Sequence, residues 1–130
     1  MKYINNIARK QTVDYIISTF NKISVQSGEC RYNFRCQYNS VHEAKKNKHS
    51  KIAMCVYIEY GYPIIHFINY NKEKFIDNTL GQWSSRLDFY FIKWIEDEDM
   101  WNVDDIFSAF RNELKNRLSW WIRLTMSDMF

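Results

Sequence analysis

Residues 52–77, IAMCVYIEYGYPIIHFINYNKEKFID, decide the fold. Two apolar runs in this stretch, 52–58 and 63–69, are rich in β-branched and aromatic residues, which favour strands. A third short run, 75–77, follows a polar turn. The three runs predict an antiparallel meander, which the apolar segment 88–95 extends to about four strands.

Helical patterns lie before and after the predicted strands. From Val13, apolar residues recur every three or four positions, and Thr12 is expected as the N-cap. Cys36 is expected to open a second helix, because the residues after it lack Gly and Pro and include good helix formers. A third, amphipathic helix is expected after Asn102, with Asp105 completing a capping box.

The order of these elements predicts one α+β domain over residues 1–130, with N-terminal helices, the meander and a C-terminal amphipathic helix. Residues 26–28 (QSG) are expected to end the first helical segment, and 29–35 to form an ordered loop. The tail 118–130, LSWWIRLTMSDMF, is expected either to dock on the sheet or to form a dimer or membrane-surface patch.

The composition agrees with one folded domain. A chain of 130 residues has the size of a single domain, and 46% hydrophobic with 25% charged residues excludes a disordered one. No apolar stretch approaches the roughly 18 residues of a membrane span, and the N-terminus lacks a secretory pattern. Three Cys without a disulfide-scaffold spacing indicate thiols in a reducing, cytoplasmic compartment.

The net charge of +3 is unevenly divided along the chain. Residues 1–51 carry ten Lys and Arg against three Asp and Glu, a balance of +7, whereas residues 52–130 carry eight against twelve, a balance of −4. The basic part is either a solvated surface or a site for an anionic partner such as nucleic acid. Its cations and aromatic residues are Arg9, Lys10, Arg31, Arg35, Lys45, Lys46, Lys48 and Lys51, with Tyr32, Phe34 and Tyr38.

The most informative chemical feature is the order Cys36, His66, Asp77. A thiol at the start of a helix faces unpaired N–H groups and the positive end of the helix dipole, which favour the reactive thiolate. His66 interrupts an apolar strand, and Asp77 ends the next strand. If the hairpin is centred between Asn71 and Lys72, His66 lies directly opposite Asp77 and their side chains share a face. The carboxylate would then orient His66 toward Cys36, as in a nucleophile–base–orienter triad.

A Cys that opens a helix, followed by a small meander with His and then Asp, resembles the papain-like and transglutaminase-like cysteine superfamily. The resemblance covers about 36–81, and residues 77–81 (DNTLG) are similar to the Asp-Pro-Thr segment that ends the transglutaminase-like core. It implies Cys36 as nucleophile, His66 as general base and acid, and Asp77 as orienting carboxylate. An Ile-, Asn- and Lys-rich composition, typical of AT-rich genomes, also suits small phage proteins of this type.

The sequence departs from the family pattern around the nucleophile. Gln37 follows Cys36, where the family often has an aromatic or small residue, and no Gly-rich stretch surrounds the Cys. Besides the Cys36 backbone N–H, the candidate oxyanion donors are Gln37, Asn33 and Asn39.

Each of these residues also has a purely structural interpretation. Cys36 can be a small residue at a helix start, His66 a core histidine, and Asp77 a turn residue. Cys30 is a competing nucleophile, whereas Cys55 lies within an apolar run and is expected to be buried and inert.

The spacing of the Cys and His residues does not favour a metal site. Its ligands would be Cys30, Cys36, His42 and His49, but their spacing, C-x5-C-x5-H-x6-H, matches no zinc pattern. No metal or cofactor is therefore implied. His42 and His49 are expected on a solvated helix or at its end.

The leading functional hypothesis is a small thiol-dependent hydrolase or acyl transferase acting on an amide, ester or thioester, with a protein or peptide substrate. The first alternative is a non-enzymatic phage protein that binds and inhibits a host factor in the host cytoplasm, through the C-terminal helix or the acidic segment 96–105. The second alternative is nucleic-acid binding by the basic N-terminal part. A homodimer through the C-terminal helix is compatible with each of these hypotheses.

Overall fold

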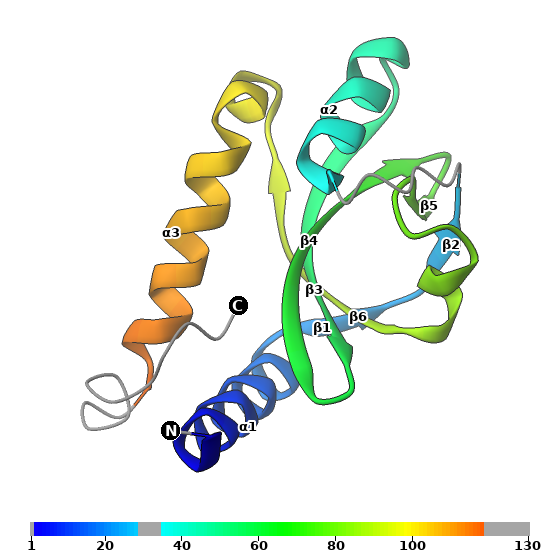
Figure 1. Cartoon of the computed structure of the whole chain (residues 1–130). Helices are drawn as coiled ribbons and strands as arrows, with labels where there is room; N and C mark the ends of the chain where they lie inside the picture. The colour runs from blue at the N-terminus through cyan, green and yellow to red at the C-terminus, as the bar shows by residue number, and fades with distance from the viewer. Residues whose placement is uncertain (1, 29–34, 119–130) are drawn as a thin grey trace.

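The computed structural model describes residues 2–28 and 35–118 (Figure 1). The elements are, in chain order, α1 (Lys2–Thr19), β1 (Asn21–Ile23), β2 (Val25–Ser27), α2 (Cys36–Lys46), β3 (Lys51–Glu59), β4 (Tyr62–Asn71), β5 (Lys74–Asp77), η1 (Gly81–Arg86), β6 (Asp88–Ile95), η2 (Asp97–Asn102) and α3 (Val103–Asn116). No helix within these residues is both long and apolar enough to cross a membrane.

The strands form one curled sheet in the order β1-β6-β3-β4-β5-β2 (Figure 1). All neighbouring strands are antiparallel except β2 and β5, which are parallel. The α+β fold with flanking N- and C-terminal helices is therefore confirmed, and the four predicted strands are β3 to β6. The sheet differs from a simple meander because β6 crosses back to pair with β3.

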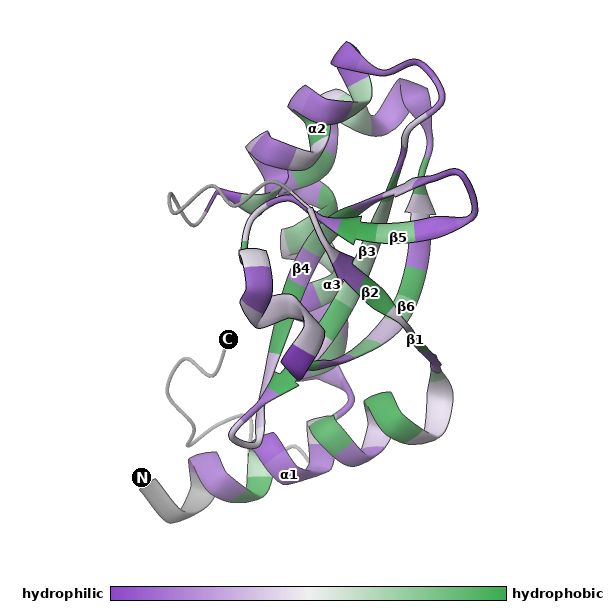
Figure 2. Cartoon of the chain, turned by 90° about the vertical axis from the view of Figure 1, so that its right-hand side faces the viewer, coloured by the Kyte–Doolittle hydropathy of each residue, from purple (hydrophilic) through white to green (hydrophobic). Residues whose placement is uncertain are grey.

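The core has two parts, one on each face of the sheet. Alternate residues of β3, such as Met54 and Val56, pack with α1, α2 and α3 through Ile16, Ala44 and Leu114. Figure 2 shows the apolar residues that run along the strands.

The opposite face has a smaller core. The intervening residues Cys55 and Tyr57 pack there with Val25, Ile68 and Phe89. Since β3 is buried on both faces, its sequence is a continuous apolar run rather than an alternation of apolar and polar residues.

The first helix begins and ends earlier than predicted, since it stops at Thr19 rather than before residues 26–28. It begins at Lys2, so Thr12 lies inside it and is not an N-cap. The Thr12 hydroxyl donates to the Ala8 carbonyl oxygen at 2.9 Å, which satisfies this buried group within the helix. Ala8, Thr12 and Ile16 are four residues apart and all buried, so they form the stripe of α1 that faces the core.

Two short strands and one cap also differ from expectation. Residues Asn21–Ile23 and Val25–Ser27 form β1 and β2, whose three residues each are too few to show a period. Asn102 precedes α3 as predicted, but its side chain makes no capping hydrogen bond. The η2 turns lead directly into α3, and Asn102 has φ −110° and ψ 18° rather than the extended backbone of an N-cap.

Several sequence-based expectations lie outside the described residues. They are Cys30 and the loop around it, with Arg31, Tyr32, Asn33 and Phe34, and the tail after Leu118, with its Trp pair.

Candidate active site

The β4–β5 hairpin brings His66 and Asp77 together in a register that differs from the predicted one. Asn71 pairs with Lys74 and Asn69 with Ile76, so the turn is centred between Lys72 and Glu73. Both turn residues have positive φ, 52° and 63°, as in a two-residue type I′ turn.

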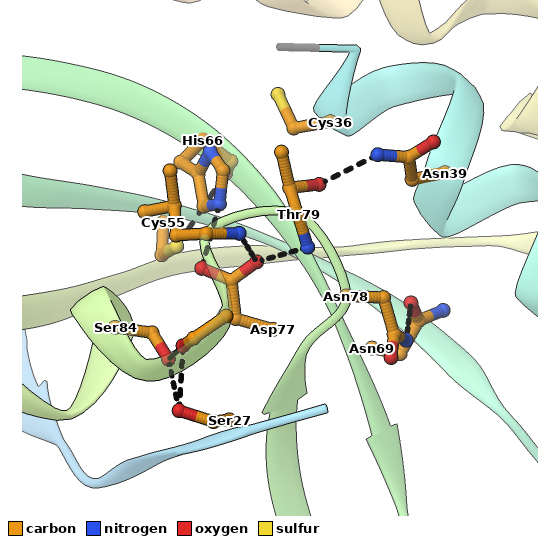
Figure 3. Close-up of polar contacts among 12 residues, drawn as sticks. Ser27, Cys36, Asn39, Cys55, His66, Asn69, Asp77, Asn78, Thr79 and Ser84 are labelled. Carbon is orange, nitrogen blue, oxygen red and sulfur yellow. Dashed lines mark hydrogen bonds and ion pairs between the residues drawn. The ribbon is translucent and has the colours of Figure 1, made fainter. Parts of the chain in front are cut away.

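The register prediction was therefore wrong by two residues, and the two side chains are diagonal rather than directly opposite. A shift of two preserves the alternation of faces, so both still lie on one face. Diagonal neighbours on one face are within reach of long side chains. His66 Nε2 and Asp77 Oδ2 are 3.0 Å apart (Figure 3).

Asp77 is fully buried, and both of its carboxylate oxygens are engaged. Oδ2 faces His66, whereas Oδ1 accepts the backbone N–H groups of Thr79 at 2.8 Å and Leu80 at 3.3 Å. A short Asx-type loop after β5 thus fixes the carboxylate. These contacts hold the Asp77 side chain in one orientation relative to the His66 ring.

His66 is 4% exposed and is surrounded by aromatic rings. The Tyr57 ring meets it edge-on with centroids 5.2 Å apart, and Phe89 lies at 6.3 Å. Burial lowers the pKa of His66, but hydrogen bonds and electrostatic interactions with Asp77 and Cys36 outweigh burial and raise the pKa from 6.5 to about 9. The ring is therefore stabilised as an imidazolium beside the buried Asp77 carboxylate.

Cys36 is the first residue of α2 and lies at the edge of β4. On that side β5 pairs only with the end of β4, from Asn69 to Asn71, so the start of β4 has no strand partner there among the described residues. Cys36 and His66 both line a cavity of about 300 Å³ at this edge. In Figure 3, Cys36 lies on the side of His66 opposite Asp77.

The two ring nitrogens of His66 have different surroundings. Nε2 is bonded to Asp77, which leaves Nδ1 as the nitrogen that can exchange a proton with the thiol. The Cys36 Sγ donates to Gln37 Oε1 at 3.1 Å. The Cys36 side chain is 8% exposed and lines the same cavity as His66.

Buried amide side chains tie α2 to the loop that follows β5. Asn39 Nδ2 donates to Thr79 Oγ1 at 3.0 Å, and Asn69 Nδ2 donates to the Ser40 carbonyl oxygen at 2.9 Å. Asn78 Nδ2 in turn donates to Asn69 Oδ1 at 3.1 Å. The helix that carries the thiol and the loop that orients the carboxylate are thereby held together.

Sequence reasoning missed the role of this network. Asn39 was considered as an oxyanion donor, whereas its amide bonds to Thr79 and is 1% exposed. Gln37, the other described oxyanion candidate, lines the cavity. The available signal for the network was Asn69, a polar residue at the end of an otherwise apolar strand.

Cys55 is the second thiol near His66. It pairs directly with His66 across β3 and β4, and its Sγ donates to the His66 carbonyl oxygen at 3.4 Å. The side chain is fully buried, as predicted, and burial raises the pKa of the thiol well above its usual range. This thiol is held in its neutral form.

The two other His residues lie apart from this site. His42 is exposed on α2 and stacks on Tyr38 with ring centroids 5.9 Å apart, and His49 is exposed beyond the helix. Within residues 2–28 and 35–118, no three His, Cys, Asp or Glu side chains are arranged to hold a metal ion.

Comparison of the chain with protein-family models, curated proteins and solved structures finds no match.

Proposed function

We propose that this protein is a thiol-dependent hydrolase or acyl transferase in which Cys36 is the nucleophile, His66 the general base and acid, and Asp77 the orienting carboxylate. The observation that carries the proposal is the buried 3.0 Å contact between His66 Nε2 and Asp77 Oδ2, with Cys36 across the same cavity. This arrangement supports a spatial order of nucleophile, base and orienting carboxylate, which nucleophilic catalysis requires.

In the acylation step, the Cys36 thiolate attacks the carbonyl carbon of an ester, thioester or amide. A C–S bond forms, and the electron pair of the C=O bond moves to oxygen. The bond to the leaving group then breaks, and the proton on His66 Nδ1 passes to the departing atom. The products are an acyl-thioester on Cys36, the free leaving group and a neutral His66.

In the deacylation step, water or an amine gives a proton to His66 and attacks the thioester carbonyl. The C–S bond breaks, the acyl product leaves, and the thiolate–imidazolium pair is restored. Asp77 orients the ring in both steps, because one of its oxygens contacts His66 and the other accepts a loop N–H group.

The start of α2 can stabilise the oxyanion of both steps. The Asn39 N–H bonds to the Arg35 carbonyl oxygen, so it is the first amide that is bonded within the helix. The amides of Cys36, Gln37 and Tyr38 precede it and have no acceptor within the helix. Backbone N–H groups of this kind stabilise developing negative charge on a carbonyl oxygen.

The cavity favours an uncharged acyl group. Besides Cys36 and His66, its lining is mostly apolar and comes from Tyr57, Ile64, Ile65, Leu80 and Phe107, together with Gln37 and Thr79. Among the residues that the structure describes, no carboxylate and no basic side chain other than His66 lines it.

The direct test is capture of the acyl-enzyme with p-nitrophenyl acetate. The proposal predicts a burst of p-nitrophenolate, stoichiometric with protein, and an acetyl group on Cys36 in the peptide mass spectrum. Cys36→Ser and His66→Gln should each abolish the burst. Cys55→Ala is the matched control, since its thiol is held neutral, and should leave the burst unchanged.

Acetylation that is slow, that spreads over exposed Lys residues, or that is the same in His66→Gln would overturn the proposal. That result would favour a binding protein without enzymatic activity.

A further inference from the structure

A second cavity lies between α1 and the tip of the β3–β4 hairpin, and the proposed catalytic chemistry does not use it. This α1–hairpin groove has a volume of about 460 Å³, within the usual range of ligand sites. Asn6, Arg9 and Lys10 line it from α1, and residues 60–62 (YGY) line it from the hairpin. It shares no lining residue with the cavity of Cys36.

The charge of the groove has one sign. Of the described residues that line it, Arg9 and Lys10 are the charged ones, and none of these residues is a carboxylate. Among the residues that the structure describes, neither cation forms a salt bridge. The groove therefore complements an anionic group.

Arg9 is held in a fixed orientation. Its guanidinium carbon lies 4.4 Å from the centroid of the Tyr62 ring, and one of its N–H groups donates to Asn6 Oδ1. A guanidinium that stacks by its face keeps its remaining N–H groups in the plane of the group, where they can bind a phosphate in bidentate fashion.

Tyr60 is exposed at an unfavourable backbone position. It has φ 51° in the two-residue turn with Gly61, at φ 78°. A type I′ turn favours Asn or Asp at the first of these positions, and a bulky residue with positive φ is uncommon there. The Tyr60 side chain is nevertheless 85% exposed at the mouth of the groove, so its packing does not explain this choice of residue.

We propose that the α1–hairpin groove binds a nucleotide unit, in which a planar base stacks on Tyr60 and the phosphate binds Arg9 and Lys10. An exposed aromatic ring beside fixed cations is the arrangement that binds single-stranded nucleic acids through base stacking and phosphate contacts. The unit comes either from a free nucleotide or from a single strand, and the two sources share this chemistry.

The test is fluorescence anisotropy with a labelled oligothymidylate of about ten nucleotides, at about 50 mM salt. AMP, UMP, an abasic strand of equal length and inorganic phosphate serve as competitors. Competition by the mononucleotides as strong as by the unlabelled strand assigns the site to free nucleotides, whereas stronger competition by the strand assigns it to single strands. Either result requires the abasic strand and phosphate to compete at least about ten-fold more weakly.

Variants separate the contribution of the base from that of the charge. Arg9→Gln with Lys10→Gln should weaken binding at least ten-fold and reduce the slope of log K against log salt by about 1.4, at about 0.7 per phosphate contact. Tyr60→Asn should weaken binding about ten-fold. The same change should raise the melting temperature, because Asn suits the turn. A merely structural role for Tyr60 would not produce these opposite effects.

Two matched controls complete the test. Lys74→Gln removes one exposed cation outside the groove and should leave the dissociation constant within about two-fold of the wild type. Cys36→Ser should also bind normally, so failure of the proposed enzyme activity would not count against this site. Absence of binding, abasic-strand competition equal to that of the intact strand, or binding unchanged in the Arg9 and Tyr60 variants would each overturn the proposal.

Discussion

Two charge pairs of this protein have the same length but lie in opposite environments. His66 and Asp77 join β4 to β5 at 3.0 Å with side chains 5% and 0% exposed. Lys22 and Asp88 join β1 to β6 at 3.0 Å with side chains 61% and 60% exposed. Both are diagonal cross-strand pairs, since Lys22 lies opposite Tyr90, two residues beyond Asp88.

The difference shows that burial, rather than the distance between the charged atoms, decides how much a charge pair contributes to stability. Water and salt screen the exposed pair, and such pairs contribute at most about 1 kcal/mol. The interior cannot solvate a lone charge, so removal of one partner of a buried pair costs about 3–5 kcal/mol. Only the buried pair can therefore hold an imidazolium in place for a neighbouring thiol.

The largest expected effect comes from neutralising the carboxylate of each pair in turn. Asp77→Asn should lower the free energy of unfolding by about 3–5 kcal/mol, because the buried His66 loses its anionic partner. Asp88→Asn is the matched control and should lower it by less than about 1 kcal/mol. Urea unfolding at neutral pH measures both, and equal losses would contradict the account.

The pH dependence of stability should be almost as large. The pKa of His66 is raised from 6.5 to about 9 in the folded protein, so the native state holds this proton more tightly than the unfolded chain. The stabilisation is therefore fully present below pH 6.5 and is lost as pH rises through 9. The difference corresponds to about 3 kcal/mol.

Urea unfolding between pH 6 and 10 measures this loss, and NMR titration of the His66 ring locates the proton. Asp77→Asn should remove most of the pH dependence, since burial then dominates and lowers the pKa of His66. A wild-type stability that is flat across this range would show that His66 is not held as an imidazolium.

The backbone beside the buried pair gives a smaller effect. A Cβ at Gly28 would lie 2.2 Å from Asn78 Oδ1 and 2.6 Å from Ile76 Cγ2, and the Gly28 N–H donates to the Asp77 carbonyl oxygen at 2.8 Å. Gly28→Ala should therefore cost about 1–3 kcal/mol through overpacking next to Asp77.

Gly61→Ala provides the matched comparison for Gly28. A Cβ at Gly61 meets nothing within 4 Å, so only the left-handed backbone at φ 78° opposes the substitution, at about 1 kcal/mol. Thermal unfolding measures both variants. A Gly28 variant as stable as the Gly61 variant would mean that the residues around Asp77 shift at little cost to accommodate the added Cβ.

The smallest effect concerns the turn that sets the register of the buried pair. Lys72 and Glu73 both have positive φ, which residues with a Cβ adopt at some cost. Replacing them with Asn and Gly, the preferred type I′ pair, should raise the free energy of unfolding by about 1 kcal/mol. Unchanged NMR signals of His66 would verify the register, whereas loss of stability would argue against this turn type.

The same turn explains which parts of the structure the sequence could and could not predict. The apolar runs that became β3 to β6 are visible from composition, and so is the helix start at Cys36. The polar stretch before 75–77 predicts a turn, but Lys72 and Glu73 are not the residues that mark the centre of a type I′ turn, so the predicted hairpin centre was misplaced. The prediction that His66 meets Asp77 held because an even shift keeps both on one face.

Other features depend on contacts between distant segments. Asn39 bonds to Thr79, and Arg9 stacks on Tyr62, and neither contact has a local pattern in the sequence. Thr12 looked like a cap because its buried role inside α1 depends on the packing of that helix against the sheet.

The central claim is that the buried His66–Asp77 pair activates Cys36. The most direct measurement is the rate of iodoacetamide alkylation of each Cys as a function of pH, followed by peptide mass spectrometry in the wild type and in His66→Gln. The account predicts that Cys36 reacts well below the pH at which an ordinary thiol, with a pKa of about 8.5, ionises, and that His66→Gln removes this advantage. Cys55, buried and neutral, should stay unreactive in both proteins. An ordinary thiol profile at Cys36 that does not change in His66→Gln would contradict the claim.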